Sequence, residues 1–378
     1  MMVNSFISFL LLALSCLWQG VYSFVPSARQ SDRCMLKKVS KLSETASPEI
    51  NTDEDTMVSP SQESYDALLD WLKLSGAVVN EAIEICPSSL GVGYGVKLTA
   101  NVKKDELLFT IPRNACFTLE DATSDPDCGK AFERLIEKAG QGANTVVMAA
   151  QMSLQYLQIQ YDMDTAKTTQ NKWAPYFQTL PWKRNINNQE HVLFWSNEMV
   201  ESLVKGSASY DEAVALRQEV DLAIKVTTGI VGNKLQKYRR EEEESTFWPW
   251  QSKAPSVPPP GLSEAVKGAF VCLLTRAFQD GDEGDEEKLV PLLDLLQHSN
   301  EPNIRHQMLK ADGTVEVRAR RDIEAGEELL NQYRSEQDDT MPYSRFWSRF
   351  GFVPGITEPI ENLFEDKSTI FFPQSKEV

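Results

Sequence analysis

Hydrophobic residues follow helical and strand-like periods in different parts of the chain. Residues 64–74 place apolar side chains at helical spacing, with acidic residues at the start, and predict a short amphipathic helix. Alternation after the glycine cluster at residues 91–95 predicts strands, and residues 107–111 predict a buried strand. Because this glycine cluster leads into a strand pattern and not a helix, it argues against a dinucleotide-binding fold.

The middle of the chain has a helical pattern. Residues 146–160 are rich in good helix formers, and residues 198–237 contain long stretches with a period of 3.6. The proline-rich connection SKAPSVPPPG at residues 252–261 is incompatible with a helix or a central strand. A further helix is predicted over residues 262–278.

The pattern changes back to strands and turns towards the C-terminus. Residues 281–287, GDEGDEE, predict an exposed acidic loop, and residues 289–333 alternate short strands with turns. Gly313 predicts a hairpin, and Gly326 predicts a turn before a last strand. Strands, a helical insertion and more strands together predict the α+β class.

Charge limits the classes of partner. The chain has a formal net charge of −17; residues 1–42 contain five basic residues and one acidic residue, a balance of +4, which leaves about −21 for the rest. Such a body repels phosphates, so nucleic acid is not an expected partner. A basic protein or a lysine-rich substrate segment is attracted instead, although acidity can also serve solubility alone.

The six cysteines predict neither a metal centre nor a disulfide framework. None forms a CxxC pair, and their spacings fit no zinc site, so reduced thiols are expected. With three histidines in the chain, a histidine-based metal centre is also not expected.

The N-terminus has the composition of a targeting segment. Residues 6–18, FISFLLLALSCLW, have the length of a signal-peptide core and are short for a membrane span. A Ser-rich, basic stretch follows from Phe24. A signal core, a Phe-led junction and a basic transit segment resemble the bipartite plastid presequence of algae with secondary plastids, such as diatoms. Plastid import is therefore expected, with cleavage before Phe24; the secretory pathway or an uncleaved anchor are the alternatives.

Two polar features near the C-terminal strands are candidates for chemistry. An apolar run from Leu289 ends abruptly in polar residues that need partners, among them Asp294, Gln297 and His298. These groups either satisfy one another in a structural turn or line a polar ligand pocket. Tyr333 follows a strand, where a tyrosine can be a core, an interface or a catalytic residue.

Six ordered motifs between about residues 85 and 355 resemble the SET domain family, in the branch of Rubisco large-subunit methyltransferase and its actin-histidine-methylating relative. They are Gly93-Tyr-Gly95 with ANVKKDELLFTIP, WAPYFQTLP from Trp173, Thr275-Arg-Ala-Phe278, LVPLLDLLQHS from Leu289, RDIEAGEELLNQY from Arg321, and RFGFV from Arg349. The resemblance implies a SET fold of short β-sheets with a helical insertion.

The resemblance also implies a division of the chain. The expected parts are a presequence (1–42), a disordered linker (43–60), an N-terminal SET part (61–125), a helical SET insertion (126–262), a C-terminal SET part (263–355) and a short tail (356–378). The large helical C-terminal domain with which relatives hold protein substrates is expected to be absent.

The function implied is S-adenosylmethionine-dependent protein-lysine N-methylation of a non-histone, plastid protein. Carried over by position, the catalytic residue is Tyr333, and the cofactor contacts are Gly93, Gly95, Glu106, Leu107, Leu108, Arg276, Asp294, Leu295, Leu296, Gln297, His298 and Phe350. No metal is implied. A lysine amine must lose its proton before it attacks, and an apolar channel near a positive sulfonium favours the neutral amine.

Three positions depart from the family pattern. Gln297 replaces the family's Asn and is one methylene longer, Arg334 replaces a Gly after the tyrosine, and Asn331 replaces an apolar residue. These changes keep open a catalytically inactive SET module that binds a partner protein. The resemblance to the actin-histidine-methylating relative keeps open a second alternative, methyl transfer to a histidine or another nitrogen.

Overall fold

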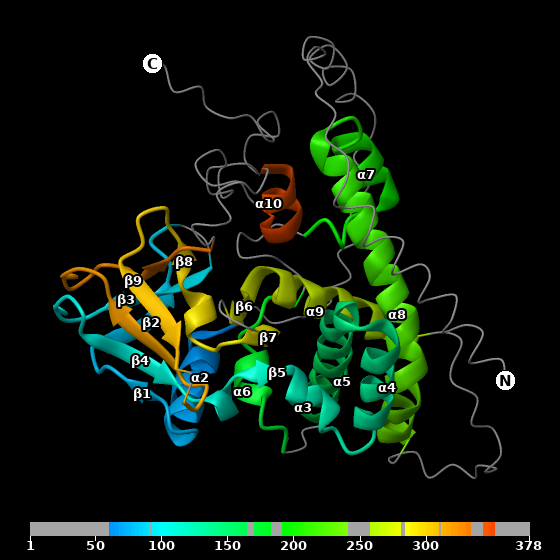
Figure 1. The fold of residues 1–378 in the computed structure, drawn as a ribbon, viewed down its shortest axis with the longest axis horizontal. Coiled ribbons are helices and arrows are strands. Elements are labelled where there is room, and N and C mark those ends of the chain that lie inside the picture. The colour runs from blue at the N-terminus through cyan, green and yellow to red at the C-terminus, as the bar shows by residue number, and fades with distance from the viewer. Residues whose placement is uncertain are drawn as a thin grey trace. The chain divides into compact units, whose positions relative to one another are not determined.

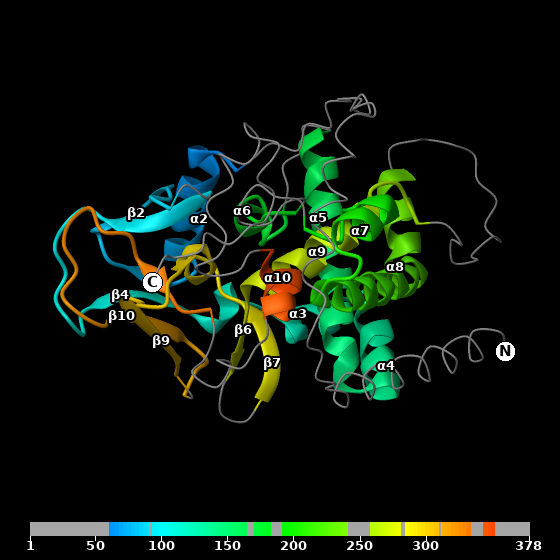
Figure 2. The same ribbon diagram turned by 90° about the horizontal axis from the view of Figure 1, so that it is seen from above.

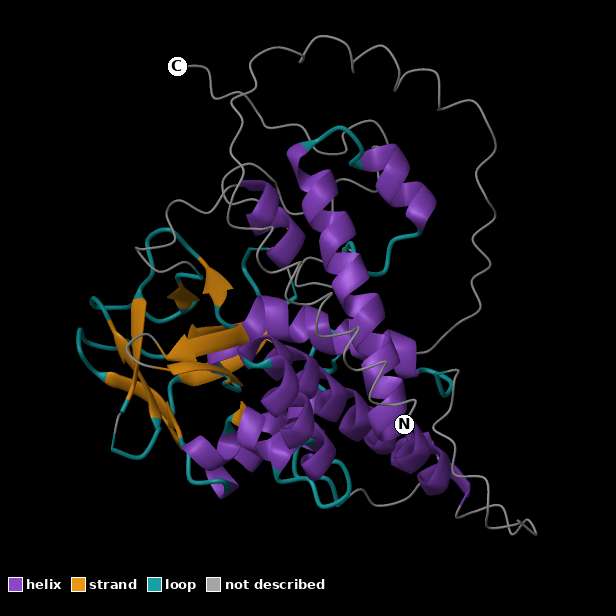
Figure 3. Cartoon of the chain, turned by 45° about the vertical axis from the view of Figure 1, so that its right-hand side comes forward, coloured by secondary structure: helices purple, strands orange, loops and turns teal. Residues whose placement is uncertain are grey.

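The computed structural model describes residues 60–90, 93–164, 170–182, 191–240, 258–280, 284–309, 311–333 and 343–351. Within this part, the strands gather on one side and most of the helices on the other (Figures 1 and 3). The predicted α+β class is confirmed.

A four-stranded antiparallel sheet lies among the strands. Its order is β1 (Val78–Val79), β4 (Leu107–Ile111), β10 (Val315–Ala319) and β9 (Ile304–Met308). Strand β10 alternates buried and half-buried residues, which is the period of a strand with one face in the core. The predicted buried strand at residues 107–111 is confirmed, and Gly313, with a φ of 71°, lies in the predicted hairpin turn between β9 and β10.

Three smaller sheets complete the strand part. Strands β2 (Ile83–Pro87) and β3 (Tyr94–Leu98) form an antiparallel pair. Strand β7 (Gly284–Leu289) lies between β5 (Phe117–Thr118) and β6 (Ala277–Asp280). Strands β8 (Gln297–His298) and β11 (Leu330–Asn331) pair in parallel.

Helix α2 (Gln62–Leu74) confirms the predicted amphipathic helix. The Ser61 side chain caps it by accepting a hydrogen bond from the backbone N–H of Ser64. The helix buries Tyr65, Leu68 and Leu72, which are three or four residues apart and therefore share one face. This face packs against β2 and against the short helix α6 (Ala174–Phe177).

The helical part is built around three long helices. Helix α5 (Asn144–Asp164) packs against α8 (Ala208–Arg240) and α9 (Leu262–Arg276), and Figure 2 shows them crossing one another. Gly268 lets the chain at Trp182 approach α9, since a Cβ there would lie 2.2 Å from the Trp182 carbonyl oxygen. The remaining helical elements are α3 (Leu119–Thr123), α4 (Gly129–Ala139), α7 (Asn197–Leu203), α10 (Tyr343–Phe350), and the 3₁₀ turns Arg113–Ala115, Gln141–Ala143 and Leu293–Leu295.

Two sequence predictions differ from the structure. The helix predicted over residues 262–278 is confirmed as α9, but it ends at Arg276, and Ala277 begins strand β6. The acidic loop predicted at 281–287 is strand β7 from Gly284 onwards, while residues 281–283 lie outside the described part. Both errors have one cause: β6 and β7 pair with each other, and this pairing outweighs the local preference of either segment.

The described residues contain no helix that is long and apolar enough to cross a membrane. The predicted signal core, Phe24 and almost all of the predicted linker lie outside them. Among the described residues, Cys86, Cys116, Cys128 and Cys272 form no disulfide bond with one another. Within the described ranges, no three His, Cys, Asp or Glu side chains are grouped as a metal ion would require.

Candidate active site

The parallel pair of β8 and β11 brings together the two candidate segments of the sequence. Gln297 lies opposite Leu330 and His298 opposite Asn331. The backbone N–H of Ser299 extends the pairing by donating to the Asn331 carbonyl at 2.8 Å. Parallel strands need a long crossover, and here β9 and β10 supply it. The run that ends in Asp294–His298 therefore meets the segment that ends in Tyr333.

Tyr333 is held at this junction by both its backbone and its side chain. Its hydroxyl donates to the Leu296 carbonyl at 2.9 Å, and its backbone N–H donates to Nδ1 of His298 at 3.1 Å. The rings of His298 and Phe350 lie 5.1 and 5.6 Å from the Tyr333 ring, centre to centre. Burial raises the pKa of Tyr333 well above its ordinary value, so the phenol is protonated at neutral pH.

A buried ion pair lies next to Tyr333. Arg276, the last residue of α9, donates from Nη1 to the Asp294 carbonyl at 2.8 Å and lies 3.5 Å from Oδ2 of the same residue. The Tyr176 hydroxyl donates to that Oδ2 at 2.8 Å. Burial raises the pKa of Asp294, and the Arg276 charge and the Tyr176 hydroxyl oppose the rise.

Two atoms of this cluster keep unused hydrogen-bonding capacity. Arg276 Nε and Asp294 Oδ1 are buried, and neither has a hydrogen-bond partner within the described part of the chain. Buried polar atoms are nearly always satisfied, so an unused donor and an unused acceptor on two ion-paired residues leave room for a further partner such as a ligand or a water. The adjoining Leu292 has a φ of 69° although it is not glycine and is fully buried, a costly conformation that often accompanies function.

The glycine turn is tied to the same junction through Glu328. Gly93 has a φ of 58°, and a Cβ on Gly95 would lie 2.1 Å from Oε1 of Glu328. The Glu328 carboxylate accepts hydrogen bonds from the Ser88 hydroxyl at 2.7 Å and the Ser89 backbone N–H at 2.8 Å. The absence of a side chain at Gly95 thus makes room for the carboxylate that holds the turn.

Gln297 has a contact that explains its length. Its side chain is buried, and Nε2 donates to the Tyr94 carbonyl at 2.9 Å. This bond joins β8 to the strand that follows the glycine turn, 203 residues away in sequence. The longer side chain therefore serves as a clamp between two parts of the site.

The structure gathers most of the predicted site residues. Those placed around the β8–β11 junction are Arg276, Asp294, Leu295, Leu296, Gln297, His298, Tyr333 and Phe350, with Gly93 and Gly95 tied to it through Gln297 and Glu328.

Three predicted cofactor contacts have neighbours away from the β8–β11 junction. Glu106 is exposed and accepts hydrogen bonds from the backbone of Lys103 and, at 3.4 Å, from the side chain of Asn80. Leu107 and Leu108 belong to β4, in the four-stranded sheet. Their role in cofactor binding stays a prediction.

Two tyrosines of the site were missed by the sequence analysis. Tyr176 belongs to the WAPY motif, so its position in a recognised motif was an available signal. Tyr65, on α2, has its ring 4.3 Å from that of Tyr94, and burial raises its pKa to about 12 against the nearby charge of Arg276. Nothing in its local sequence distinguishes Tyr65 from an ordinary core residue of an amphipathic helix.

The SET domain family model matches residues 93–334, which is more than half of the chain. The chain belongs to the SET domain family. Its fold is similar to the solved SET domain of LSMT bound to lysine and AdoHcy, with a TM-score of 0.53 and 14% identity over 81% of this chain and 63% of that one. A second solved structure, Rubisco LSMT bound to AdoMet, gives a TM-score of 0.51 at 15% identity over 80% and 62% of the two chains.

Curated relatives from animals and yeast match between about half and three quarters of the chain. N-lysine methyltransferase setd6 of Xenopus laevis is 23% identical over 70% of this chain and 53% of its own length. Ribosomal lysine N-methyltransferase 4 of Saccharomyces cerevisiae is 22% identical over 75% and 54%. Actin-histidine N-methyltransferase of Drosophila melanogaster is 28% identical over 47% and 27%. The chain thus spans about half the length of the lysine methyltransferases that it matches.

Proposed function

We propose that this SET protein is an S-adenosylmethionine-dependent protein-lysine N-methyltransferase that acts on a non-histone protein in a plastid. The observation that carries the proposal is the convergence at the β8–β11 junction of a protonated Tyr333 phenol with the buried Arg276–Asp294 pair. The names of the lysine methyltransferases from Xenopus laevis and Saccharomyces cerevisiae support lysine as the target.

The residues present fit such a cofactor. The unused Arg276 Nε is a donor suited to a carboxylate, and the unused Asp294 Oδ1 is an acceptor suited to an ammonium group. The amino-acid end of S-adenosylmethionine carries both groups. We assign its binding to Arg276, Asp294, the backbone of residues 295–298, and Phe350. When bound, S-adenosylmethionine supplies an activated methyl group on a positive sulfur.

The chain's own residues prepare the attacking nitrogen. The Tyr333 hydroxyl is fixed by the Leu296 carbonyl, and its oxygen keeps lone pairs that can orient a substrate amine. The buried Arg276 cation disfavours a second positive charge close by, so a lysine amine that enters the site loses its proton more readily. Alignment of this kind can contribute ~7–11 kcal/mol to lowering the barrier.

His298 is assigned a positioning role. Its Nδ1 accepts from the Tyr333 backbone N–H at 3.1 Å, and its Nε2 lies 3.3 Å from the Asn300 side-chain oxygen. These contacts fix the backbone that carries Tyr333.

The test is transfer of labelled methyl from S-adenosylmethionine to plastid proteins by the full chain, with Tyr333→Phe as the variant. We expect Tyr333→Phe to lose roughly 100-fold or more in transfer rate, while binding of S-adenosylhomocysteine changes little, because the phenol acts on the amine. Tyr210→Phe is the matched control, since Tyr210 is a partly buried tyrosine on α8 whose hydroxyl contacts Glu201, away from the β8–β11 junction. A wild-type chain that binds no cofactor in calorimetry contradicts the proposal.

Mass spectrometry of the modified residue separates lysine from histidine. The match to an actin-histidine methyltransferase keeps histidine as a second candidate target. An inactive module that binds a partner protein is the other candidate, and the departure at Gln297 favours it. Cofactor binding without transfer to any plastid protein or lysine-rich peptide would support that module.

The plastid assignment rests on the predicted bipartite presequence. A fluorescent protein fused after residue 42 should enter the plastid of an alga with secondary plastids. Phe24→Ala should redirect the fusion protein to the secretory pathway, because the Phe-led junction is the feature that distinguishes a plastid presequence from a plain signal peptide. Secretion of the unaltered fusion would overturn the assignment.

A further inference from the structure

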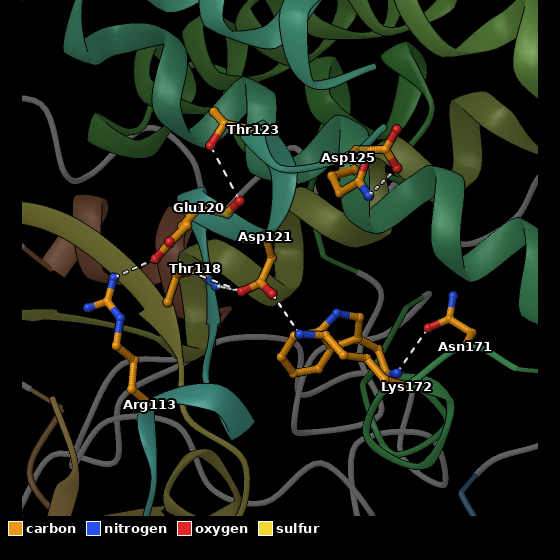
Figure 4. A network of polar contacts seen from close by, with 10 residues as sticks. Arg113, Thr118, Glu120, Asp121, Thr123, Asp125, Asn171 and Lys172 are labelled. Carbon is orange, nitrogen blue, oxygen red and sulfur yellow. Dashed lines mark hydrogen bonds and ion pairs between the residues drawn. The ribbon is translucent and has the colours of Figure 1, made fainter. Parts of the chain in front are cut away.

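Helix α6 is fixed on the neighbouring elements by polar contacts at its start. Lys172 Nζ lies 2.8 Å from Oδ1 of Asp121, whose other carboxylate oxygen accepts from Thr118 in the capping box of α3. The Asn171 side chain accepts from the Trp173 backbone N–H at 2.9 Å. Figure 4 shows Lys172 reaching Asp121 from the segment that leads into α6.

Aromatic packing fixes the same helix from its buried side. Trp173 is almost fully buried and lies with its ring centre 5.2 Å from Phe117 and 5.9 Å from Trp71 of α2. Phe177 packs edge-on against Phe117 and Trp182. Because contacts fix both the start and the apolar face of α6, the position of Tyr176 is fixed as well.

The Tyr176 hydroxyl meets a carboxylate that burial makes costly to ionise. Tyr176 and Asp294 are both buried, and the 2.8 Å bond between them spans 118 residues of sequence. The other titratable or charged groups that act on Asp294 or its partners are Arg276 and Cys272 on α9, Tyr65 on α2, and Tyr333 after β11. Of these, Arg276 alone is a cation.

We propose that Tyr176 is a positioning residue for the Asp294 carboxylate: it occupies Oδ2, keeps the group ionised, and leaves Oδ1 as the acceptor for a ligand ammonium. The ligand part of this inference rests on the proposed function. Two observations carry it, namely the hydrogen bond from a fully fixed helix and the buried Oδ1 that has no partner among the described residues.

The contribution of the Tyr176–Asp294 hydrogen bond to stability depends on pH. Burial already raises the pKa of Asp294, and Tyr176 opposes that rise. A carboxyl with a raised folded-state pKa costs stability progressively as pH rises above its unfolded-state pKa, and the cost is complete above the folded-state pKa; losing Tyr176 raises that folded-state pKa further. Removing the hydroxyl therefore destabilises the protein more at neutral pH than at acidic pH.

The experiment compares thermal unfolding of full-length wild type and Tyr176→Phe at pH 7.5 and pH 5. We expect Tyr176→Phe to lower Tm more at pH 7.5 than at pH 5, since a hydrogen bond to a charged acceptor is stronger than one to a neutral acceptor. Thr179→Val is the matched control, because its hydroxyl is buried in the next turn but donates to a neutral carbonyl, that of Tyr176, at 2.7 Å. Its cost should be equal at the two pH values.

Calorimetry with S-adenosylhomocysteine provides the second measurement. At pH 7.5, Tyr176→Phe should bind roughly 10-fold more weakly than wild type, and Thr179→Val within about twofold, because Asp294 loses both charge and orientation. If wild type binds and Tyr176→Phe binds equally well, the positioning role is overturned while the proposed function stands. If wild type does not bind, the proposed function fails, and the unfolding comparison alone decides whether Tyr176 controls Asp294.

A second background tests whether the Asp294 charge is the group on which Tyr176 acts. In the Asp294→Asn background the charge on which Tyr176 acts is gone. Adding Tyr176→Phe to it should then lower Tm at pH 7.5 by no more than it does at pH 5. A cost that stays larger at pH 7.5 in this background contradicts the proposal.

Discussion

Gln297→Asn introduces the residue that the resemblance to the SET motif leads us to expect at this position, and the structure predicts that the variant protein is less stable. The Gln297 amide donates to the Tyr94 carbonyl at 2.9 Å from a buried side chain. Asparagine is shorter by one methylene, about 1.5 Å, which moves the amide nitrogen beyond hydrogen-bonding distance.

The size of the loss follows from two contributions. A buried carbonyl that loses its donor costs about 1–3 kcal/mol. One buried methylene removes about 0.8 kcal/mol of apolar burial. The two contributions add to roughly 2–4 kcal/mol in the free energy of unfolding, and a loss of about 2 kcal/mol is expected because the Gln297–Tyr94 bond is only part-buried. The loss is a considerable share of the stability of an ordinary domain.

Urea denaturation of the full chain, followed by tryptophan fluorescence, measures this loss. Gln307→Asn is the control, because Gln307 lies exposed on β9 and bonds to Glu316 at 3.2 Å; its change should stay within about 0.5 kcal/mol. The reasoning is refuted if Gln297→Asn is as stable as wild type. If Gln297→Asn also binds the cofactor more tightly than wild type, Gln297 has weakened an ancestral cofactor site and does not serve as a clamp.

Two further predictions concern the glycine turn and a buried histidine. Gly95→Ala should lower Tm and weaken cofactor binding, because its Cβ would displace the Glu328 carboxylate that holds Ser88 and Ser89; Glu328→Gln, which keeps the shape but not the charge, should show a smaller loss. His191 is buried, and burial lowers its pKa to about 4, so its neutral form contributes stability that is present above pH ~6.5 and is lost as pH falls towards 4. In His191→Gln, urea denaturation across this range should show a shallower pH dependence, by about 3 kcal/mol over the interval; an unchanged slope would assign the acid sensitivity to other groups.

The sequence was most informative where a local pattern and the tertiary structure require the same thing. Helix α2 has a capping serine and one apolar face, and β4 is a short apolar run that the core buries. The turn at Gly313 requires a positive φ, which glycine adopts without strain. In each case the residues that form the element also bury it, so the pattern predicts the element.

The sequence did not predict the secondary structure of segments whose conformation depends on pairing with distant strands. Nothing local in the acidic run at 284–289 indicates a strand, because β7 exists through its partners β5 and β6. The helix before it ends at Arg276 for the same reason, and this end places the guanidinium beside Asp294.

The sequence by itself determined the SET family, the fold class and most of the residues gathered around Tyr333, because motifs of fixed order keep the residue types that the site needs. The tertiary structure decided how these residues are connected. The parallel pairing of β8 with β11, the clamp from Gln297 to Tyr94 and the bond from Tyr176 to Asp294 join segments that are far apart in sequence. Hydrogen bonds across such separations depend on how the whole chain packs, and no local pattern of polar and apolar residues encodes them.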